Sequence, residues 1–198
     1  NVEDIEMVRE VEKENPHLKL KYGFNHRYHH SVKRAKEIID NKDFGEIINF
    51  RGVYGKSSVV PIENEWRSLK KYSGGGILLD QGIHMLDLFR FFCGDFEEVK
   101  SFVSNKYWGH NVEDNAYAIL RDTKGRVGMI HSSATQWQHR FRLEITFEQG
   151  YLELSGILSG SKSYGQEKLV IIPRQINSNV GSLNHQEINY LEDNSWEE

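Results

Sequence analysis

Apolar residues recur at the three- and four-residue spacing of an amphipathic helix in three segments of the chain. These segments are residues 3–15, 31–40 and 77–92. Pro16 follows the first segment and Gly94 follows the third, and helices commonly stop at such residues. We therefore predict three helices, the third of them strongly apolar.

Alternation of apolar and polar residues predicts strands in the rest of the chain. The predicted strands are residues 18–24, 46–54, 99–108, 116–121, 126–131, 142–147, 151–154 and 168–172. Turn residues at 122–125 and 148–150 join neighbouring strands as hairpins, and the irregular stretch 55–76 is too long for an idle connection. The predicted fold class is α+β: an open, largely antiparallel sheet with helices on one face. The polar tail, residues 177–198, receives no assignment.

Two of the predicted strands are apolar on both of their alternating faces. Residues 116–120 and 127–130 carry aliphatic side chains at odd and even positions. Such strands are typical of a sheet that is covered on both sides. The chain's own helices cover one side, so we expect a second copy to cover the other, giving a homo-oligomer through the sheet.

Composition excludes several classes of protein. The 198 residues include 25 Lys and Arg against 29 Asp and Glu, so a basic nucleic-acid-binding surface is not expected. No apolar run approaches the roughly 20 residues that a membrane helix needs. A single cysteine allows neither an internal disulfide nor a paired-cysteine metal site, and it suits a reducing, cytoplasmic setting.

The stretch 74–87 carries the most informative chemistry. Three glycines precede Asp80 and His84, which are four residues apart and therefore share one face of a helix. A carboxylate beside an imidazole suits general acid–base catalysis. Two alternatives remain open: an ion pair inside a core helix, and a metal site, although nothing nearby completes a ligand set.

Six further residues are candidate substrate contacts because they follow strand ends or lie in the long loops. They are Arg27, Tyr28, Trp66, Arg67, Trp137 and His139. A solvated arginine and a tryptophan that only covers the core are the alternatives for Arg27 and Trp66. We interpret the neighbouring histidines 26, 29 and 30 as surface residues rather than metal ligands.

The motif Gly-Gly-Gly-x-x-x-Asp-x-Gly-x-His-x-x-Asp at 74–87 resembles the signature of the glucose–fructose oxidoreductase, inositol dehydrogenase and rhizopine-catabolism (Gfo/Idh/MocA) family. Residues 23–28, 44–47 and 65–67 are similar to further family segments in the same order. The resemblance covers roughly residues 1–160. It implies a hydride transfer between NAD or NADP and a sugar or cyclic polyol. It also implies that His84 is the acid–base group and that Asp80 orients it or binds substrate.

The family's glycine-rich dinucleotide fingerprint and its Glu-Lys-Pro segment are absent from this sequence. We therefore expect a fragment, inactive alone and cut short at its C-terminal end. Residues 1–24 would be the last helix and strand of a Rossmann domain that binds the cofactor, and residues 25–198 the substrate-binding and oligomerisation domain. The alternatives are a non-catalytic interaction module of this fold and a metal-dependent lyase or isomerase.

Overall fold

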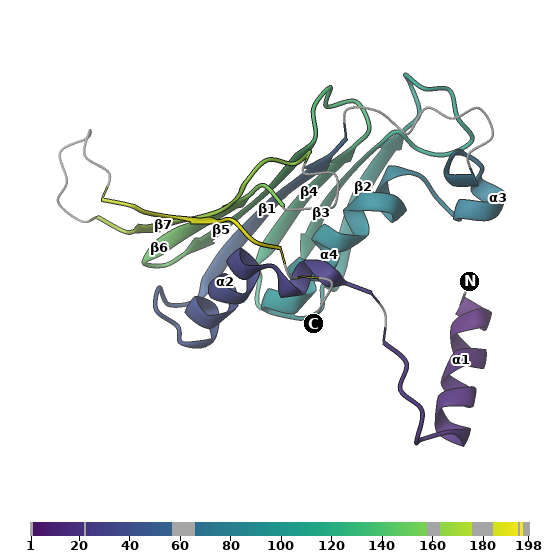
Figure 1. The fold of residues 1–198 in the computed structure, drawn as a ribbon, viewed down its shortest axis with the longest axis horizontal. Helices are drawn as coiled ribbons and strands as arrows, with labels where there is room; N and C mark the ends of the chain where they lie inside the picture. Colours follow the sequence, from purple (N-terminus) through teal and green to yellow (C-terminus); the bar gives the residue numbers. More distant parts are fainter. Residues whose placement is uncertain are drawn as a thin grey trace.

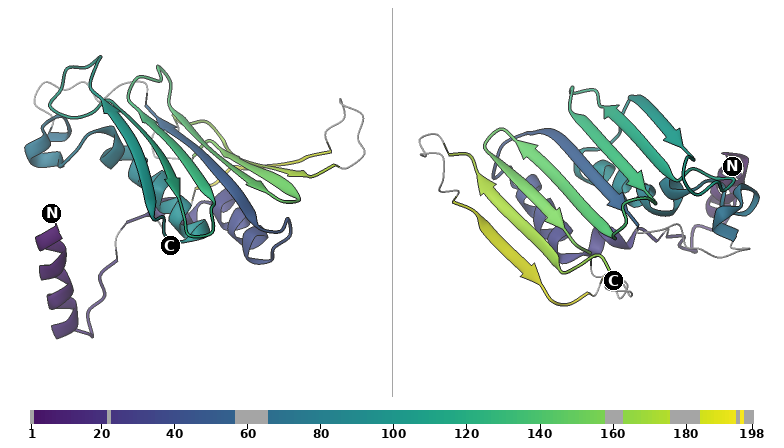
Figure 2. Two further views of the ribbon diagram at one scale, coloured as in Figure 1. Left: turned by 180° about the vertical axis from the view of Figure 1, so that it is seen from behind. Right: turned by 90° about the horizontal axis from the view of Figure 1, so that it is seen from above.

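The computed structural model of the chain describes residues 2–21, 23–56, 66–157, 163–175, 184–193 and 195. The body is one open sheet of eight strands with helices packed on one face (Figure 1). Figure 2 shows the other face of the sheet, on which no helix of the described segments lies. The predicted α+β class is thereby confirmed.

Within the described residues the strands lie in the order β2-β3-β4-β1-β5-β6-β7-β8, and of these neighbouring pairs only β1 and β4 are parallel. Their bounds are β1 Ile47–Gly55, β2 Glu98–Ser104, β3 Asn115–Arg121, β4 Val127–Ser133, β5 Arg140–Phe147, β6 Gly150–Ser155, β7 Glu167–Pro173 and β8 Gln186–Tyr190. Because β1 and β4 are parallel, their carboxyl ends meet at one edge, where Tyr54 is in register with Ser132. This edge carries the candidate site.

The helices divide into two groups in space. Their bounds are α1 Val2–Glu14, α2 His30–Asp40, α3 Lys70–Ser73 and α4 Ile83–Cys93, with 3-10 turns η1 Asn25–Tyr28 and η2 Trp66–Ser68 and a π-helical turn η3 Leu78–Gly82. Helices α2 and α4 pack on the sheet, whereas α1 lies apart from it (Figures 1 and 2). No helix in the described segments has the length and apolar character needed to cross a membrane.

The core lies between α4 and the central strands, and two glycines bring the helix close to the sheet. A Cβ on Gly52 would lie 2.6 Å from Cγ of Met85, and one on Gly128 would lie 3.0 Å from the ring of Phe89. Both of these α4 side chains are fully buried. The close approach holds α4 firmly over β1 and β4 and thereby places His84 near the end of β1.

One predicted strand is absent, and another is shorter than predicted. The described residues within 18–24 form no strand, and Leu18 and Leu20 are exposed. A strand needs a neighbour for its backbone groups, and no described strand lies beside this segment. The prediction of a strand over 99–108 was too long, because β2 ends at Ser104 and the chain turns where the Asp114 carboxylate accepts the amide N–H of Tyr107.

The polar tail and the long loop contain structure that the sequence pattern did not indicate. Strand β8 at 186–190 pairs with β7, so the tail extends the sheet by one strand. The stretch predicted as irregular over 55–76 contains η2 and α3. Residues 57–65, which include Glu65 of the motif segment, lie outside the described residues.

Candidate functional site

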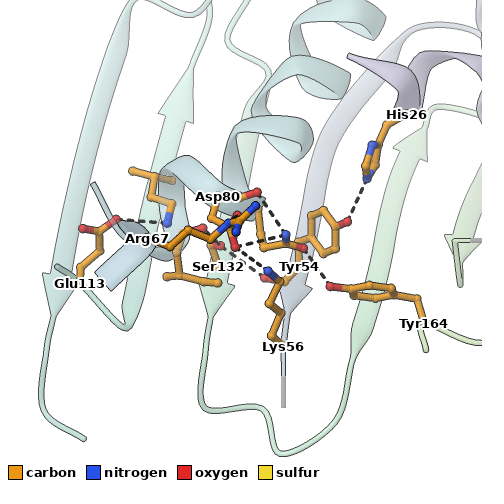
Figure 3. A network of polar contacts seen from close by, with 11 residues as sticks. His26, Tyr54, Lys56, Arg67, Asp80, Glu113, Ser132 and Tyr164 are labelled. Atoms are coloured by element: carbon orange, nitrogen blue, oxygen red, sulfur yellow. Dashed lines mark hydrogen bonds and ion pairs between the residues drawn. The ribbon is translucent and has the colours of Figure 1, made fainter. Parts of the chain in front are cut away.

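A cleft of about 170 Å³ lies beside the carboxyl end of β1 and the turn that leads into α4. Its polar lining comes from the end of β1, from η2, from η3 and from the segment before β3. The charged and aromatic lining residues are Lys56, Trp66, Arg67, Asp80 and Glu113. Figure 3 shows the polar network at this edge of the sheet.

The glycines of the motif allow the chain to enter η3 tightly against the segment before β3. The Glu113 carboxylate accepts the backbone N–H groups of Gly76 at 2.9 Å and of Leu78 at 3.1 Å, and its carbonyl accepts that of Ile77. These bonds satisfy N–H groups at the helix start that would otherwise be unpaired. Ser132 of β4 donates to the Ile77 carbonyl at 3.0 Å. The turn that carries Asp80 is therefore tied to the sheet.

Asp80 is bound by two cations rather than by His84. One carboxylate oxygen lies 2.5 Å from the Lys56 ammonium nitrogen, and the other lies 3.4 Å from Nε of Arg67. The expected pairing of Asp80 with His84 assumed regular α-helical spacing. Residues 78–82 instead form a π-turn, which inserts extra residues into the helix and changes which side chains face each other.

The predicted pair Trp66 and Arg67 does lie in the cleft. The Arg67 guanidinium stands over the Trp66 ring, 4.6 Å from its centroid, and its Nε lies 3.4 Å from a carboxylate oxygen of Asp80. Trp66 is half-exposed, so the part of its ring that Arg67 does not cover is an accessible apolar surface of the cleft. Both residues are placed where a bound molecule would meet them.

His84 faces an aromatic group on the other side of the turn. Its ring stacks on the ring of His26 at 4.1 Å between centroids and meets the edge of Phe24 at 6.0 Å. Burial lowers the pKa of His84 below its ordinary value of 6.5, while the nearby carboxylates of Asp87 and Asp80 raise it. The net direction is downward, so the imidazole is neutral at pH 7 and able to accept a proton.

The interpretation of the histidines as surface residues was wrong for two of the three. His26 and His29 are buried, with 6% and 2% of their surface exposed. Each has a polar partner: Nε2 of His26 lies 3.0 Å from the Tyr54 hydroxyl oxygen, and Nδ1 of His29 lies 3.1 Å from a Glu167 carboxylate oxygen. Local sequence did not indicate these partners, which lie on β1 and β7.

Arg27 and Tyr28 are not among the residues that line the cleft. The Arg27 guanidinium binds both oxygens of Asp87, with 2.7 Å between Nε and Oδ2. Tyr28 lies under the ammonium groups of Lys21 and Lys33. The structure thus gives Arg27 a structural ion pair and leaves both residues as substrate contacts only in prediction.

Trp137 and His139 lie in the loop between β4 and β5. Trp137 is exposed, has a left-handed φ of 55°, and packs against Tyr107 at 4.8 Å. His139 meets the ring of Tyr164 edge-on at 4.9 Å and lines a separate, shallow polar depression. Tyr164 in turn donates to the Gln81 side chain at 2.9 Å. His139 is therefore close to the site network, and Trp137 belongs to an aromatic cluster outside the cleft lining.

Four residues of the network escaped sequence reasoning: Tyr54, Lys56, Glu113 and Tyr164. Lys56 offered one signal, since it lies two residues after a predicted strand, where sheet proteins often place functional groups. The described residues hold no group of three or more His, Cys, Asp or Glu side chains arranged to bind a metal ion.

We expect the chain to lose stability as the pH falls below 6.5. Burial, with His84 and His29 nearby, holds the pKa of His26 well below its ordinary value of 6.5, and burial likewise lowers the pKa of His84. Below pH 6.5 the unfolded chain binds protons that the folded chain does not, so each histidine costs up to about 1.4 kcal/mol per pH unit until its folded pKa is reached. Urea unfolding measured from pH 7.5 to 5 tests this.

Carboxylates provide the internal control for that experiment. The pKa of Glu167 is held below its ordinary 4.5 by hydrogen bonds from His29 and Ser31, so its contribution to the free energy of unfolding is lost only at lower pH.

A His26→Asn variant should show a flatter pH dependence of the free energy of unfolding between pH 6.5 and 5. An unfolding free energy that stays constant over this range in the unmodified chain would contradict the assignment.

Comparison with known proteins identifies the family of this chain. The model of the GFO/IDH/MocA C-terminal domain matches residues 32–153, which is more than half of the chain. The chain belongs to this family. Levoglucosan dehydrogenase from Pseudarthrobacter phenanthrenivorans is 29% identical over 153 residues, covering 64% of this chain and 38% of the relative. Myo-inositol 2-dehydrogenase from Thermotoga maritima is 27% identical over 139 residues, covering 67% and 39%.

Solved structures of the family share the fold. A levoglucosan dehydrogenase in complex with NADH and levoglucosan superposes with a TM-score of 0.68 at 22% identity, covering 84% of this chain and 46% of that one. An NAD-binding oxidoreductase from Klebsiella pneumoniae superposes with a TM-score of 0.66 at 22% identity, covering 83% and 45%. The chain therefore spans less than half the length of these family members.

Proposed function

We propose that this chain is the substrate-binding domain of an NAD(P)-dependent oxidoreductase that moves a hydride between nicotinamide and a hydroxyl-bearing carbon of a sugar or cyclic polyol. The observation that carries the proposal is the cleft that the cation-bound Asp80 lines. The neutral His84 is not among the residues that line the cleft and lies four residues further along the chain, in α4. The family members with matching sequences are sugar and polyol dehydrogenases. The activity belongs to the complete protein, because the chain covers only part of such an enzyme.

The lining of the cleft suits a polyhydroxylated ring. Trp66 presents an exposed aromatic face for the apolar C–H side of a sugar. Lys56 and Arg67 donate hydrogen bonds, and Asp80 accepts them, so hydroxyl groups find both kinds of partner. A small number of polar groups converging beside an aromatic surface is typical of small-molecule sites.

His84 is the proposed acid–base group. In the direction of oxidation its neutral imidazole accepts the proton of the substrate hydroxyl, and in reduction the imidazolium returns it. Asp80 holds no hydrogen bond to the buried Nδ1 of His84, which lacks a partner among the described residues. We therefore assign Asp80, fixed by Lys56, to binding a substrate hydroxyl rather than to orienting the imidazole.

The cofactor would be held by a domain outside this sequence. The nicotinamide, when bound, supplies the hydride acceptor or donor. The sequence contains no glycine-rich dinucleotide fingerprint, and the residues present fit only the substrate side of such a site. NAD and NADP both remain candidates.

Residues 1–24 are proposed to belong to that preceding domain. Helix α1 and the segment after it expose the large apolar side chains Ile5, Met7, Val11, Leu18 and Leu20. An amphipathic helix normally buries such an apolar stripe against neighbouring elements, but α1 lies apart from the other described helices and strands (Figure 1). A preceding cofactor domain would cover it. We also place the parent enzyme in the cytoplasm, which suits a chain with one cysteine.

The complete protein should bind NADH or NADPH and oxidise a sugar or polyol, whereas the isolated chain should do neither. Fluorescence titration with each dinucleotide and absorbance assays with levoglucosan, myo-inositol and glucose test this on both proteins. The isolated chain is expected to give no signal at micromolar NADH, because its residues include no phosphate-binding glycine loop. Tight NADH binding by the isolated chain, or none by the complete protein, would refute the proposal.

We further propose that two copies of the protein associate through the open face of the sheet. That face carries exposed aliphatic and aromatic side chains along β2, β3 and β4, the members being Phe102, Tyr117, Ile119, Val127 and Met129. A contiguous apolar surface of this kind is typical of a protein interface. The second face of the sheet is then covered, as the strand pattern predicted.

Charge on this face should dissociate the oligomer. Phe102 is 81% exposed, and a Phe102→Asp, Ile119→Asp double variant should sediment as a monomer at concentrations where the unmodified complete protein does not. Leu191→Asp is the matched control, since Leu191 is 82% exposed but follows β8 at the opposite edge of the sheet. A monomer of the unmodified protein at high concentration would contradict the proposal.

A further inference from the structure

His26 occupies an unusual position beneath the candidate site. It lies in η1, is 6% exposed, and stacks on His84 with an angle of 18° between the ring planes. Its two ring nitrogens both have partners: Nδ1 contacts the side-chain oxygen of Asn25 at 3.1 Å, and Nε2 contacts the Tyr54 hydroxyl at 3.0 Å. Figure 3 shows the His26 ring aimed at the Tyr54 hydroxyl.

These partners determine the protonation of His26. The side-chain oxygen of Asn25 only accepts hydrogen bonds, and the Asn25 amide nitrogen is used on Ser195 at 3.3 Å. Nδ1 of His26 must therefore carry a proton. Because burial holds the pKa of His26 well below its ordinary value, the ring is neutral, so Nε2 accepts the proton of the Tyr54 hydroxyl. One neutral tautomer satisfies both bonds, and it leaves His26 without charge beneath His84.

His84 lacks the carboxylate that usually orients a catalytic imidazole. Its buried Nδ1 has no hydrogen-bond partner among the described residues. The two nearest carboxylates are engaged elsewhere, Asp80 by Lys56 and Asp87 by Arg27. Ring contacts with His26, Phe24 and Tyr54 remain to set the plane of the imidazole, and the contact with His26 is the shortest of the three and the only stacked one.

We propose that His26 is a positioning residue for His84: a locked, neutral imidazole whose stacked ring fixes the plane of the acid–base histidine in place of a carboxylate. The inference deepens the proposed function and rests on it for the role of His84. Tyr54, a buried residue of β1, fixes His26 through its hydroxyl and contacts His84 at 6.4 Å between ring centroids. A network on the sheet side thus sets the geometry of a side chain on the helix.

Fixing the ring without a negative charge has a chemical consequence. A carboxylate on the imidazole would raise the proton affinity of His84, whereas a neutral stacked ring adds burial and no counter-charge. The charged groups that act on His84 are Asp80, Asp87 and Lys56, and they act from outside the stack. His84 is thereby kept as a free base near neutral pH.

Two variants of the complete protein separate positioning from mere packing. His26→Asn removes the ring and admits water, so kcat should fall roughly 10- to 100-fold with KM little changed, and the acid limb of kcat/KM should move to higher pH. The double variant His26→Phe, Tyr54→Phe keeps both rings and removes both ends of their buried hydrogen bond. It should keep most of kcat and leave the acid limb near its original pH.

A matched control tests a histidine that stacks elsewhere. His30 stacks on Tyr190 at 5.6 Å with 17° between the planes, and it is not one of the rings that contact His84 in the described structure. His30→Phe should change neither kcat nor the pH profile. Loss of activity in the double variant equal to that in His26→Asn, or an unmoved acid limb in His26→Asn, overturns the proposal.

A spectroscopic measurement keeps the inference separate from the proposed activity. Histidine-selective 15N labelling of the complete protein should show His26 as the Nδ1–H tautomer, without titration at pH values where exposed histidines titrate. His84 should titrate below 6.5 and shift upward in His26→Asn. If these spectra hold while no dehydrogenase activity is found, the geometry stands and the proposed function fails. An Nε2–H or charged His26 at neutral pH refutes the locked tautomer directly.

Discussion

Replacing His84 with glutamine in the complete protein is expected to lower kcat on the order of 10²- to 10⁴-fold, which is the usual contribution of a general acid–base group. Glutamine keeps the approximate size and polarity of the side chain but cannot take a proton near neutral pH. The fold should survive, because His84 is only half-buried and its Nδ1 makes no hydrogen bond that would be lost. Steady-state kinetics with the best sugar or polyol substrate measure the effect.

His110 provides the matched control for this variant. It is another half-buried histidine with a buried ring nitrogen that lacks a partner in the described structure, and it stacks on Trp108 in the loop between β2 and β3. His110→Gln should therefore leave kcat unchanged. Equal losses in the two variants would mean that the effect reflects stability, and full activity in His84→Gln would remove His84 from the mechanism.

Gly76→Ala is expected to destabilise the chain by about 3 kcal/mol or more, at the upper end of the cost of overpacking. A Cβ at this position would lie 2.1 Å from the carbonyl oxygen of Glu113 and 2.8 Å from its amide nitrogen. Both are backbone atoms, so no side-chain rotation relieves the clash. The bonds from Glu113 to the start of η3 would be disrupted as the two segments separate.

Gly75 is the control, because it differs from Gly76 in the space that is available for a Cβ atom. A Cβ on Gly75 would meet the Leu79 side chain at 3.4 Å, which is an ordinary contact, and its φ does not require glycine. Gly75→Ala should therefore change the free energy of unfolding by far less than Gly76→Ala. Urea titration of both variants decides the matter, and similar midpoints for the two would show that the approach of Glu113 to Gly76 is not a constraint.

Local patterns predicted most of the fold because most elements bury one face. The helix at 31–40 follows from the spacing of its apolar residues, and the β3–β4 and β5–β6 hairpins follow from strand alternation and turn residues. The strand predicted at 18–24 failed because alternation is only half of what a strand needs, and its partner strands are not in the described structure. Strand β8 was missed because its pairing with β7 depends on a distant segment.

The candidate site, like the fold, was predictable only where it depends on local sequence. The motif at 74–87 and the pair Trp66 and Arg67, which the sequence singled out, contribute residues to the lining of the cleft. The partner of Asp80 could not be read from the motif, because the π-turn changes which side chains face each other and Lys56 lies outside the motif, directly after β1. The burial of His26 was likewise invisible, since its hydroxyl partner, Tyr54, lies 28 residues away.

The sequence by itself determined the three main helices, the strands β1 to β7, the family resemblance and the segment that carries the acid–base candidates. Only the tertiary structure decided which groups act together: Asp80 with Lys56 across 24 residues, Tyr164 with Gln81 across 83, and His84 with His26 across the sheet edge. The physical reason is that propensity and periodicity act over a few residues, whereas desolvation and hydrogen bonding of buried polar groups depend on what the fold brings beside them.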